Sequence, residues 1–407
     1  MSASTIDKGT MPDPNDIREW LAMNYPKHLS ILDKFEVELK LGRLSIESTA
    51  QQQGMLGSLD RLGLATRTIE LLKILIGSTR WKNAAELLLL LRGIGRELHA
   101  VGGSREPAIG NIVRRIMAAV REEAMNTDTA TSQHSTNRPS MQSILWANPQ
   151  PTRSSKSSVN SHFDDRDLPP IFYTERPEFK QTIMEAIQEI ILDLEDTHKN
   201  INEQALSYIH ADEVILTYGK SRTIERFLMA AFAKKRNFQV VVCEGAPNMG
   251  GHKMAKSLSE AGIDTIVVND SATFAVMARV NKVLLPAHAV LANGGLITSS
   301  GCNMVALAAN NMSIPVVCIV GMFKLCPMYP HEGQDTLQDM VSPSSVISLN
   351  ELGNPLMKAV KFLNPVHDYI APELVNLYVT NVGAFQPSYI YRLLAENYHS
   401  DDWESFE

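Results

Sequence analysis

The sequence predicts an α/β protein in which an N-terminal helical bundle precedes a Rossmann-like, doubly wound parallel-sheet domain. Two observations support this fold class. From residue 16 to residue 125 the apolar residues recur with a helical period, without strand-like alternation. From residue 213 onward, short runs rich in Val, Ile and Leu alternate with helical segments of roughly ten to fifteen residues. That alternation is typical of a parallel sheet covered by helices on both faces.

Shifts in composition divide the chain into four segments. Residues 1–15 are small and polar, and we expect a flexible tail there. Residues 16–125 form the predicted N-terminal helical domain, with five or six helices. Residues 126–170 are dense in Ser, Thr, Asn, Gln and Pro, and predict a polar disordered linker because they cannot bury enough apolar surface to offset their ordering entropy. Residues 171–407 form the predicted α/β domain.

Individual elements follow from the spacing of apolar residues. Residues 179–202 predict one long helix with a single apolar side, formed by Ile183, Ile187, Ile190, Ile191 and Leu194. The predicted strands are 213–218, 238–244, 265–269, 282–292 and 314–320, with two weaker candidates at 346–349 and 376–381.

Composition excludes several classes of protein. With 44 % hydrophobic residues among 407, wholesale disorder is excluded, and the net charge of −7 argues against a nucleic-acid binder that relies on bulk positive charge. Four cysteines without zinc or Cys-x-x-Cys spacing indicate free thiols in a reducing compartment. The longest apolar stretches have about ten residues, short of a membrane span, and the N-terminus lacks an apolar core typical of a signal peptide. We therefore expect a cytosolic protein.

In a parallel sheet, ligands bind beyond the carboxyl ends of the strands, so the loops there are the places to look for chemistry. The first strand ends in Gly219-Lys220-Ser221, but a phosphate-binding P-loop needs a glycine at position 214, where Val stands. Two readings remain for this loop. Either it offers an anion site at a helix N-terminus, or Ser221 caps the helix and the cations are solvated.

The other strand ends also lack a complete motif. After the second strand, Gly245 and Gly250 have the separation of a P-loop, but Gly251 occupies the lysine position. His288 follows the fourth strand without an acid or nucleophile placed for a catalytic triad. No spacing unites the remaining candidate metal ligands, which are His252, His331, Glu332 and Asp335. The residues therefore predict no cofactor and no metal.

Three sequence runs resemble the alpha, beta and delta regulatory subunits of eukaryotic translation initiation factor 2B. They are HADEVILTYGKSRTIERFL, VNKVLLPAHAVLANGGLITSSGCNMVALAA and the C-terminal NPVHDYIAPELVNLYVTNVGAFQPSYIYRLLAENYHSDD. The resemblance covers residues 16–407 apart from the linker, and it is most specific in the last forty residues.

The same fold family contains sugar-phosphate isomerases of the methylthioribose-1-phosphate type, which use a Cys, an Asp and arginines. Mapped by motif, the isomerase Cys falls on Gly219 and the Asp on His288. An Arg-Pro pair becomes Ala246-Pro247, and a later arginine becomes Lys253. Losing the acid–base groups removes a contribution of roughly 10²–10⁴-fold in rate. The resemblance thus implies a non-catalytic subunit, and the alternative is an isomerase that uses His288 as its base.

For the regulatory subunits, the resemblance implies an assembly with the alpha, delta, gamma and epsilon subunits of the exchange factor. It also implies contact with the alpha subunit of initiation factor 2, whose phosphorylation inhibits nucleotide exchange. No direct nucleic-acid or membrane partner is expected. The interface candidates are aromatic and basic side chains in two places, Tyr389, Tyr391 and Arg392 near the C-terminus and Arg80, Lys82, Arg92 and Arg96 in the helical bundle.

Overall fold

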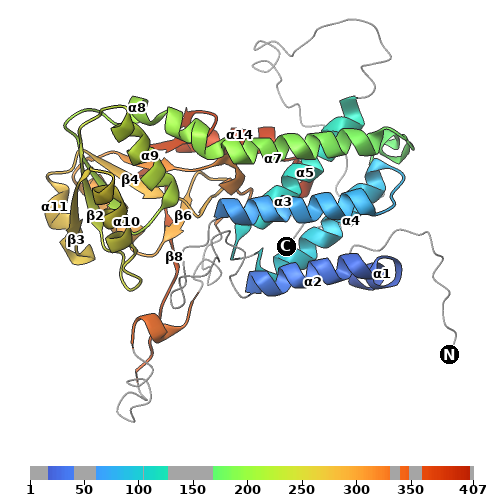
Figure 1. Ribbon diagram of the computed structural model, residues 1–407, viewed down its shortest axis with the longest axis horizontal. Helices are drawn as coiled ribbons and strands as arrows, with labels where there is room; N and C mark the ends of the chain where they lie inside the picture. Colours follow the sequence, from blue (N-terminus) through green and yellow to red (C-terminus); the bar gives the residue numbers. More distant parts are fainter. Residues whose placement is uncertain are drawn as a thin grey trace, which may run out of the picture.

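The computed structural model describes residues 17–40, 61–103, 105–126, 168–330, 340–347 and 360–403. The predicted tail at 1–15 and nearly all of the predicted linker at 126–170 lie outside the described residues. A group of helices and a layered sheet lie side by side, and one long helix runs along both (Figure 1). No helix in the described ranges is long and apolar enough to cross a membrane.

Five α-helices make up the described helical part before residue 127. They are α1 (Ile17–Asn24), α2 (Pro26–Lys40), α3 (Arg61–Ser78), α4 (Ala84–Leu98) and α5 (Pro107–Asn126), with a π-helical turn over His99–Gly103 between the last two. The side chain of Asn83 accepts a hydrogen bond from the Glu86 backbone N–H and so caps α4. Pro107 begins α5, a position where its missing N–H costs nothing.

The long helix α7 (Phe179–Glu203) confirms the single helix predicted at 179–202. Its five predicted apolar residues, Ile183 to Leu194, are all buried in the same core as the leucines of α3 and α4. Further along, Ile201 of α7 packs into a core beneath the sheet, and α8 (Ala205–Tyr208) follows. One helix therefore contributes to both parts of the molecule.

The main sheet has seven strands in the order β10-β9-β7-β4-β1-β2-β3, and only β10 is antiparallel to its neighbour. The strands are β1 (Val214–Tyr218), β2 (Gln239–Cys243), β3 (Asp264–Val268), β4 (Lys282–Pro286), β7 (Val316–Ile319), β9 (Leu377–Val379) and β10 (Ala384–Phe385). The strand order reverses at β1, so a crevice is expected beyond the carboxyl ends of β1 and β4.

Helices cover both faces of this sheet, which confirms the doubly wound prediction. They are α9 (Arg222–Ala233), α10 (Gly250–Glu260), α11 (Thr273–Met277) and α12 (Cys302–Asn311). Successive residues of β1 alternate between two cores, because Ile215 packs with α9 and α10 whereas Leu216 packs with α11 and α12. After the sheet, α14 (Ile390–Asn397) and a 3₁₀ turn (Ser400–Asp402) bring the chain back to the helical part.

Two strand predictions needed correction. The run 282–292 is not one strand, because β4 ends at Pro286 and Ala289–Val290 forms β5 in a second, antiparallel sheet with β6 (Leu296–Ser299) and β8 (His367–Ile370). The candidate at 376–381 is confirmed as β9. The candidate at 346–349 is wrong at Val346 and Ile347, which lie in a turn after a 3₁₀ helix with no sheet to bury them, and its last two residues lie outside the described ranges.

Candidate functional site

The last residue of β1 and the loops after β2 and β3 meet at the carboxylate of Asp270. Its oxygens accept hydrogen bonds from the backbone N–H groups of Gly245 at 3.0 Å and Ala246 at 2.7 Å. The hydroxyl of Tyr218 donates to the same carboxylate at 3.2 Å. The crevice therefore carries a negative charge that the protein's own donors already satisfy.

The ring of Tyr218 occupies the space between the β1 loop and the start of α12. A Cβ added at Gly301, which has φ of +98°, would lie 2.0 Å from the Tyr218 hydroxyl oxygen, so the backbone approaches the phenol more closely than any side chain would allow. Burial, with the Asp270 carboxylate beside it, raises the pKa of Tyr218, and the phenol stays protonated at neutral pH. This buried side chain therefore packs between the start of α12 and the loop after β2.

Two helix N-termini beside the crevice, those of α12 and α9, are capped by side chains of this protein, whereas α10 begins after Met249 without a side-chain cap. The carboxylate of Asp368 accepts from the backbone N–H groups of Gly301 at 2.7 Å and Asn303 at 3.2 Å, at the start of α12. At the start of α9, the Ser221 hydroxyl oxygen accepts from the Ile224 N–H. For the Gly219–Ser221 loop, the structure therefore shows the Ser221 cap, with Lys220 exposed and Arg222 half-buried.

His288 lies in the junction between the two parts of the molecule. It is only 4 % exposed, and its Nε2 lies 2.8 Å from the backbone carbonyl oxygen of Arg105, to which the neutral ring donates. Its ring stacks on His367 with centroids 4.0 Å apart. Burial, with Arg61 and His367 nearby, holds the pKa of His288 well below its usual value. His288 is therefore a packed, neutral imidazole that stabilises the junction through its contacts with Arg105 and His367.

The cysteines near the crevice are neutral thiols. Burial raises the pKa of Cys302 to about 12 and that of Cys243 to about 11. The Thr298 hydroxyl donates to the Cys302 sulfur at 3.5 Å. All four cysteines are buried and free, and within the described part of the chain no three His, Cys, Asp or Glu residues cluster in a way that suits a metal ion.

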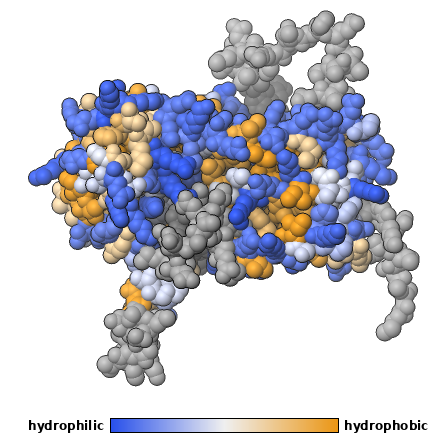
Figure 2. Space-filling view, in the orientation of Figure 1, coloured by the Kyte–Doolittle hydropathy of each residue, from blue (hydrophilic) through white to orange (hydrophobic). Residues whose placement is uncertain are grey.

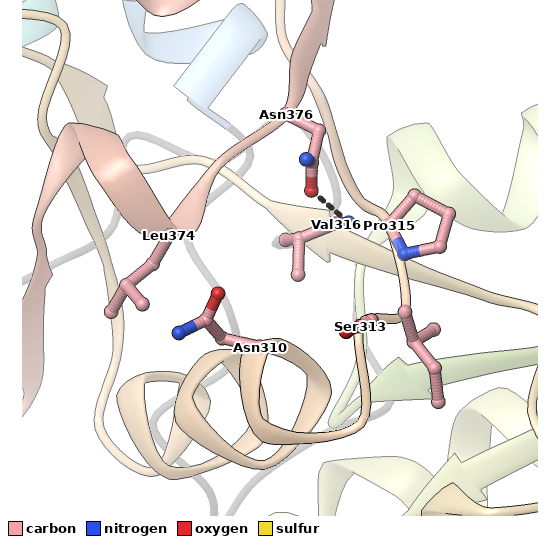
Figure 3. Close-up of a pocket in the computed structure, with 7 residues that line it drawn as sticks. Asn310, Ser313, Pro315, Val316, Leu374 and Asn376 are labelled. Atoms are coloured by element: carbon pink, nitrogen blue, oxygen red, sulfur yellow. Dashed lines mark hydrogen bonds between the residues drawn. The ribbon is translucent and has the colours of Figure 1, made fainter.

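A separate cavity lies at the opposite edge of the sheet, near the amino ends of β7 and β9 (Figure 3). It has a volume of about 290 Å³ and is lined in part by Asn310, Ser313 and Asn376. The Asn376 side chain accepts from the Val316 backbone N–H at 2.8 Å and so fixes the start of β7. No lining residue is acidic or basic, so this cavity does not supply acid–base chemistry.

The predicted C-terminal anchors lie on and just before α14. Tyr389 is half-buried and stacks on Phe385, and the Arg392 guanidinium lies 5.4 Å from the Tyr389 ring centre. Tyr391 is 53 % exposed, and its ring meets Trp403 edge-on at 5.5 Å. Among these three side chains, Tyr391 has the largest apolar surface available to a partner.

The predicted cations of the helical bundle divide into two groups. Arg80, Lys82 and Arg96 are exposed. Arg92 instead points inward, where its side chain is 12 % exposed and lies 3.5 Å from the carboxylate of Asp402. Sequence reasoning missed Asp270 and Asp402, because each is an isolated acidic residue whose partners come from distant segments.

Comparisons with known proteins agree on one family. The model of the initiation factor 2 subunit family matches residues 62–387. The chain is 40 % identical over 355 residues to translation initiation factor eIF2B subunit beta of Dictyostelium discoideum, covering 82 % of this chain and 89 % of that protein. It is 36 % identical over 365 residues to the subunit of the same name from Schizosaccharomyces pombe, covering 83 % and 92 %.

Solved structures share the fold. The crystal structure of eIF2B beta from Chaetomium thermophilum matches with a TM-score of 0.61 at 24 % identity, over 96 % of this chain and 97 % of that one. The tetrameric eIF2B-beta2-delta2 complex from the same organism matches with a TM-score of 0.63 at 23 % identity, over 95 % and 98 %. Both curated relatives are subunits of the beta type, so among the three regulatory subunits that the sequence runs resemble, the similarity is to that type.

Proposed function

Because the chain belongs to the initiation factor 2 subunit family, and its role is that of a translation initiation factor subunit, we propose that it is the beta-type regulatory subunit of the guanine-nucleotide exchange complex for initiation factor 2. It acts in the cytosol and catalyses no reaction itself. Its partners are the alpha, delta, gamma and epsilon subunits of that complex. The helical domain, residues 16–125, binds initiation factor 2, and the α/β domain, residues 171–407, pairs with the other subunits of the complex.

The hydrogen bonding at the crevice is the observation that carries this proposal. The Tyr218 hydroxyl and the backbone N–H groups of Gly245 and Ala246 donate to the Asp270 carboxylate, and those of Gly301 and Asn303 donate to Asp368. The alternative, an isomerase with His288 as its base, is disfavoured because the Nε2 of that ring is bonded to the Arg105 carbonyl inside the domain junction. Adding methylthioribose 1-phosphate to the purified protein tests this point, and turnover several orders above the background rate would contradict the proposal.

An apolar face on the sheet part supports assembly with a second subunit of the family. Its exposed side chains are Ile266 on the edge strand β3, Phe274 on α11, and Met304 and Leu307 on α12, all on the side of the sheet that α11 and α12 cover. Figure 2 shows hydrophobic side chains gathered at the end of the molecule where β3 and α11 lie. Exposed apolar patches of this kind mark interaction sites, and an edge strand offers unpaired backbone groups beside them.

Pairing with a delta-type subunit tests this face. We expect Phe274→Asp and Leu307→Asp to separate the co-expressed pair in sedimentation velocity, because each places a charge in an apolar contact. Val37→Asp is the matched control, since Val37 on α2 is 54 % exposed and Phe274 is 53 % exposed. A pair that stays intact with both sheet variants would contradict the assignment of this face.

The exposed cations of the helical part are the proposed sensor of phosphorylation on the factor's alpha subunit. A phosphoserine carries about −1.5 to −2 charges, and a nearby Lys or Arg adds a charge-assisted contact that weakens with salt. Lys82 and Arg80 lie together at the turn between α3 and α4, where Lys82 faces Glu175 at 3.9 Å with 71 % of its side chain exposed. The coupling free energy between two such distant sites is typically about 1–3 kcal/mol, which a single contact of this kind can supply.

Nucleotide release from the reconstituted complex tests the sensor. We expect Lys82→Ala and Arg80→Ala to reduce the difference in exchange rate between phosphorylated and unphosphorylated factor. The control is Lys256→Ala, because Lys256 on α10 is 78 % exposed and also pairs with a glutamate, yet belongs to the sheet part. If both helical variants keep the full difference, the sensor does not lie at this turn.

A further inference from the structure

The last described residues join the sheet part to the helical part within a very short stretch. We call residues 397–402 the C-terminal strap. At its start, Tyr398 is 4 % exposed, packs in the core of the sheet part, and donates from its hydroxyl to the Leu325 carbonyl at 3.0 Å. Four residues later, Asp402 is fully buried against α4 and α5. The strap therefore has one end in each part.

Asp402 is held by arginines from the helical part. Arg121 of α5 binds its carboxylate in a bidentate manner, with Nε at 2.8 Å from one oxygen and Nη2 at 2.9 Å from the other. Arg114 of α5 donates from Nε to the Asp402 backbone carbonyl at 3.1 Å, and Arg92 of α4 approaches the carboxylate at 3.5 Å. Fork-to-fork pairing is directional as well as strong, so it fixes the angle at which α5 meets the strap.

The charge on Asp402 makes this contact more than ordinary packing. Burying a carboxylate away from solvent costs free energy unless the group is paired and hydrogen-bonded. The buried position of Asp402 therefore depends on its hydrogen bonds to Arg121. Other ties across the junction include single hydrogen bonds from His288 to the Arg105 carbonyl, from Asn111 to the Phe323 carbonyl and from Arg115 to the Asn397 side chain. Such bonds are individually weaker than a bidentate ion pair.

The strap also reaches the predicted interface on α14. Trp403, which follows Asp402, is half-buried and meets the exposed ring of Tyr391 edge-on. A movement of α5 that shifts Asp402 therefore moves Trp403 and, with it, the ring that α14 presents to solvent. The contacts form a continuous path from α5 to the surface of the sheet part.

We propose that the C-terminal strap is an electrostatic latch in which Asp402 is a positioning residue that sets the angle between the helical and sheet parts. Opening or shifting the latch changes the presentation of Tyr391. In the exchange complex, the latch relays a shift of the helical part to α14, a statement that rests on the proposed function. The latch itself is a property of the single chain.

Distance measurement between the two parts tests the latch in the full chain without any partner. Spin labels go on Met23→Cys of α1 and Val382→Cys of the sheet part, where the native side chains are 66 % and 69 % exposed and the four native cysteines are buried. We expect one narrow distance distribution in the parent and a broad one in Asp402→Asn. Asp401→Asn is the control, because Asp401 is half-exposed and lies 3.8 Å from Arg121. A narrow, unchanged distribution in folded Asp402→Asn would overturn the proposal.

Hydrogen exchange keeps the test decisive if Asp402→Asn folds poorly. Arg92→Gln removes the guanidinium at 3.5 Å from the Asp402 carboxylate and leaves the bidentate pair with Arg121 in place. We expect faster exchange at the strap amides in this variant, by about tenfold if one charged hydrogen bond is lost, with β1 and β2 unchanged. Unchanged strap amides, or equal acceleration in strap and strands, would show that the contact is not a local latch. Neither readout involves the exchange complex, so failure of the proposed function leaves the result intact.

Discussion

Replacing Ile187 of α7 by Ala tests which part of the molecule this helix stabilises. Ile187 is fully buried and packs in the core formed with α3, α4 and α5. The sequence had assigned the segment from residue 171 to the α/β domain, whereas most of the buried face of α7 lies in the helical core. The boundary at 171 therefore stays a prediction, and this variant decides where the helix belongs energetically.

The expected loss of stability follows from the carbons removed. Ile187→Ala deletes three side-chain carbons, which corresponds to about 2.4 kcal/mol at roughly 0.8 kcal/mol for each buried CH₂. The cavity left between rigid helices adds to this loss, and we expect a total of about 3–4 kcal/mol. Leu192→Ala on the same helix is the control, because Leu192 is 51 % exposed and its truncation should cost no more than about 0.5 kcal/mol.

Urea unfolding measures how much stability is lost, and native-state hydrogen exchange measures which segments lose it. The unfolding midpoint gives the size of the loss, and exchange at individual segments locates it. We expect amides of α3 and α5 to lose protection in Ile187→Ala while those of β1 and β2 keep theirs. If the sheet strands lose protection first, or if Leu192→Ala costs as much as Ile187→Ala, the assignment of this helix to the helical core is refuted.

Three further predictions follow from the crevice and the junction. Gly301→Ala should lower the free energy of unfolding in denaturant by about 2–4 kcal/mol, because its Cβ would lie 2.0 Å from the Tyr218 hydroxyl at φ of +98°. Gly219→Ala is the control, since Gly219 has φ of +59° but open space around it, and its loss should be only about 1–2 kcal/mol. Equal losses in the two variants would contradict the steric explanation. Burial and Arg61 lower the pKa of His367 to about 4, so the unfolded chain binds more protons between that value and about 6.5; stability should therefore fall as pH drops through this window, and His367→Gln should flatten the profile of urea midpoint against pH. Because burial raises the pKa of Cys302 to about 12, iodoacetamide at pH 8 should label it slowly in the folded protein and rapidly in urea, and rapid labelling of the native protein would be inconsistent with this environment.

The sequence by itself determined the type and place of most elements. A helical period is local, because residues three and four apart share a face, and the isoleucines of α7 therefore predicted both the helix and its buried side. Continuous runs of Val and Ile likewise predicted β1, β2 and β7, because a strand buried on both faces needs apolar residues throughout. The loop sequences also excluded a P-loop, because Val214 and Gly251 stand where that motif needs a glycine and a lysine.

Only the tertiary structure decided how the crevice and the junction are built. The capping of α12 by Asp368 joins segments 67 residues apart, the bond of His288 to the Arg105 carbonyl joins segments 183 apart, and the pairing of Asp402 with Arg121 joins segments 281 apart. The split of 282–292 between two sheets also depends on a distant segment, since β6 pairs with β8 more than 60 residues later in the chain. Local periodicity reports which side of an element is apolar. Which single polar residues meet across the core depends on how the whole chain packs, and no short window of sequence contains that information.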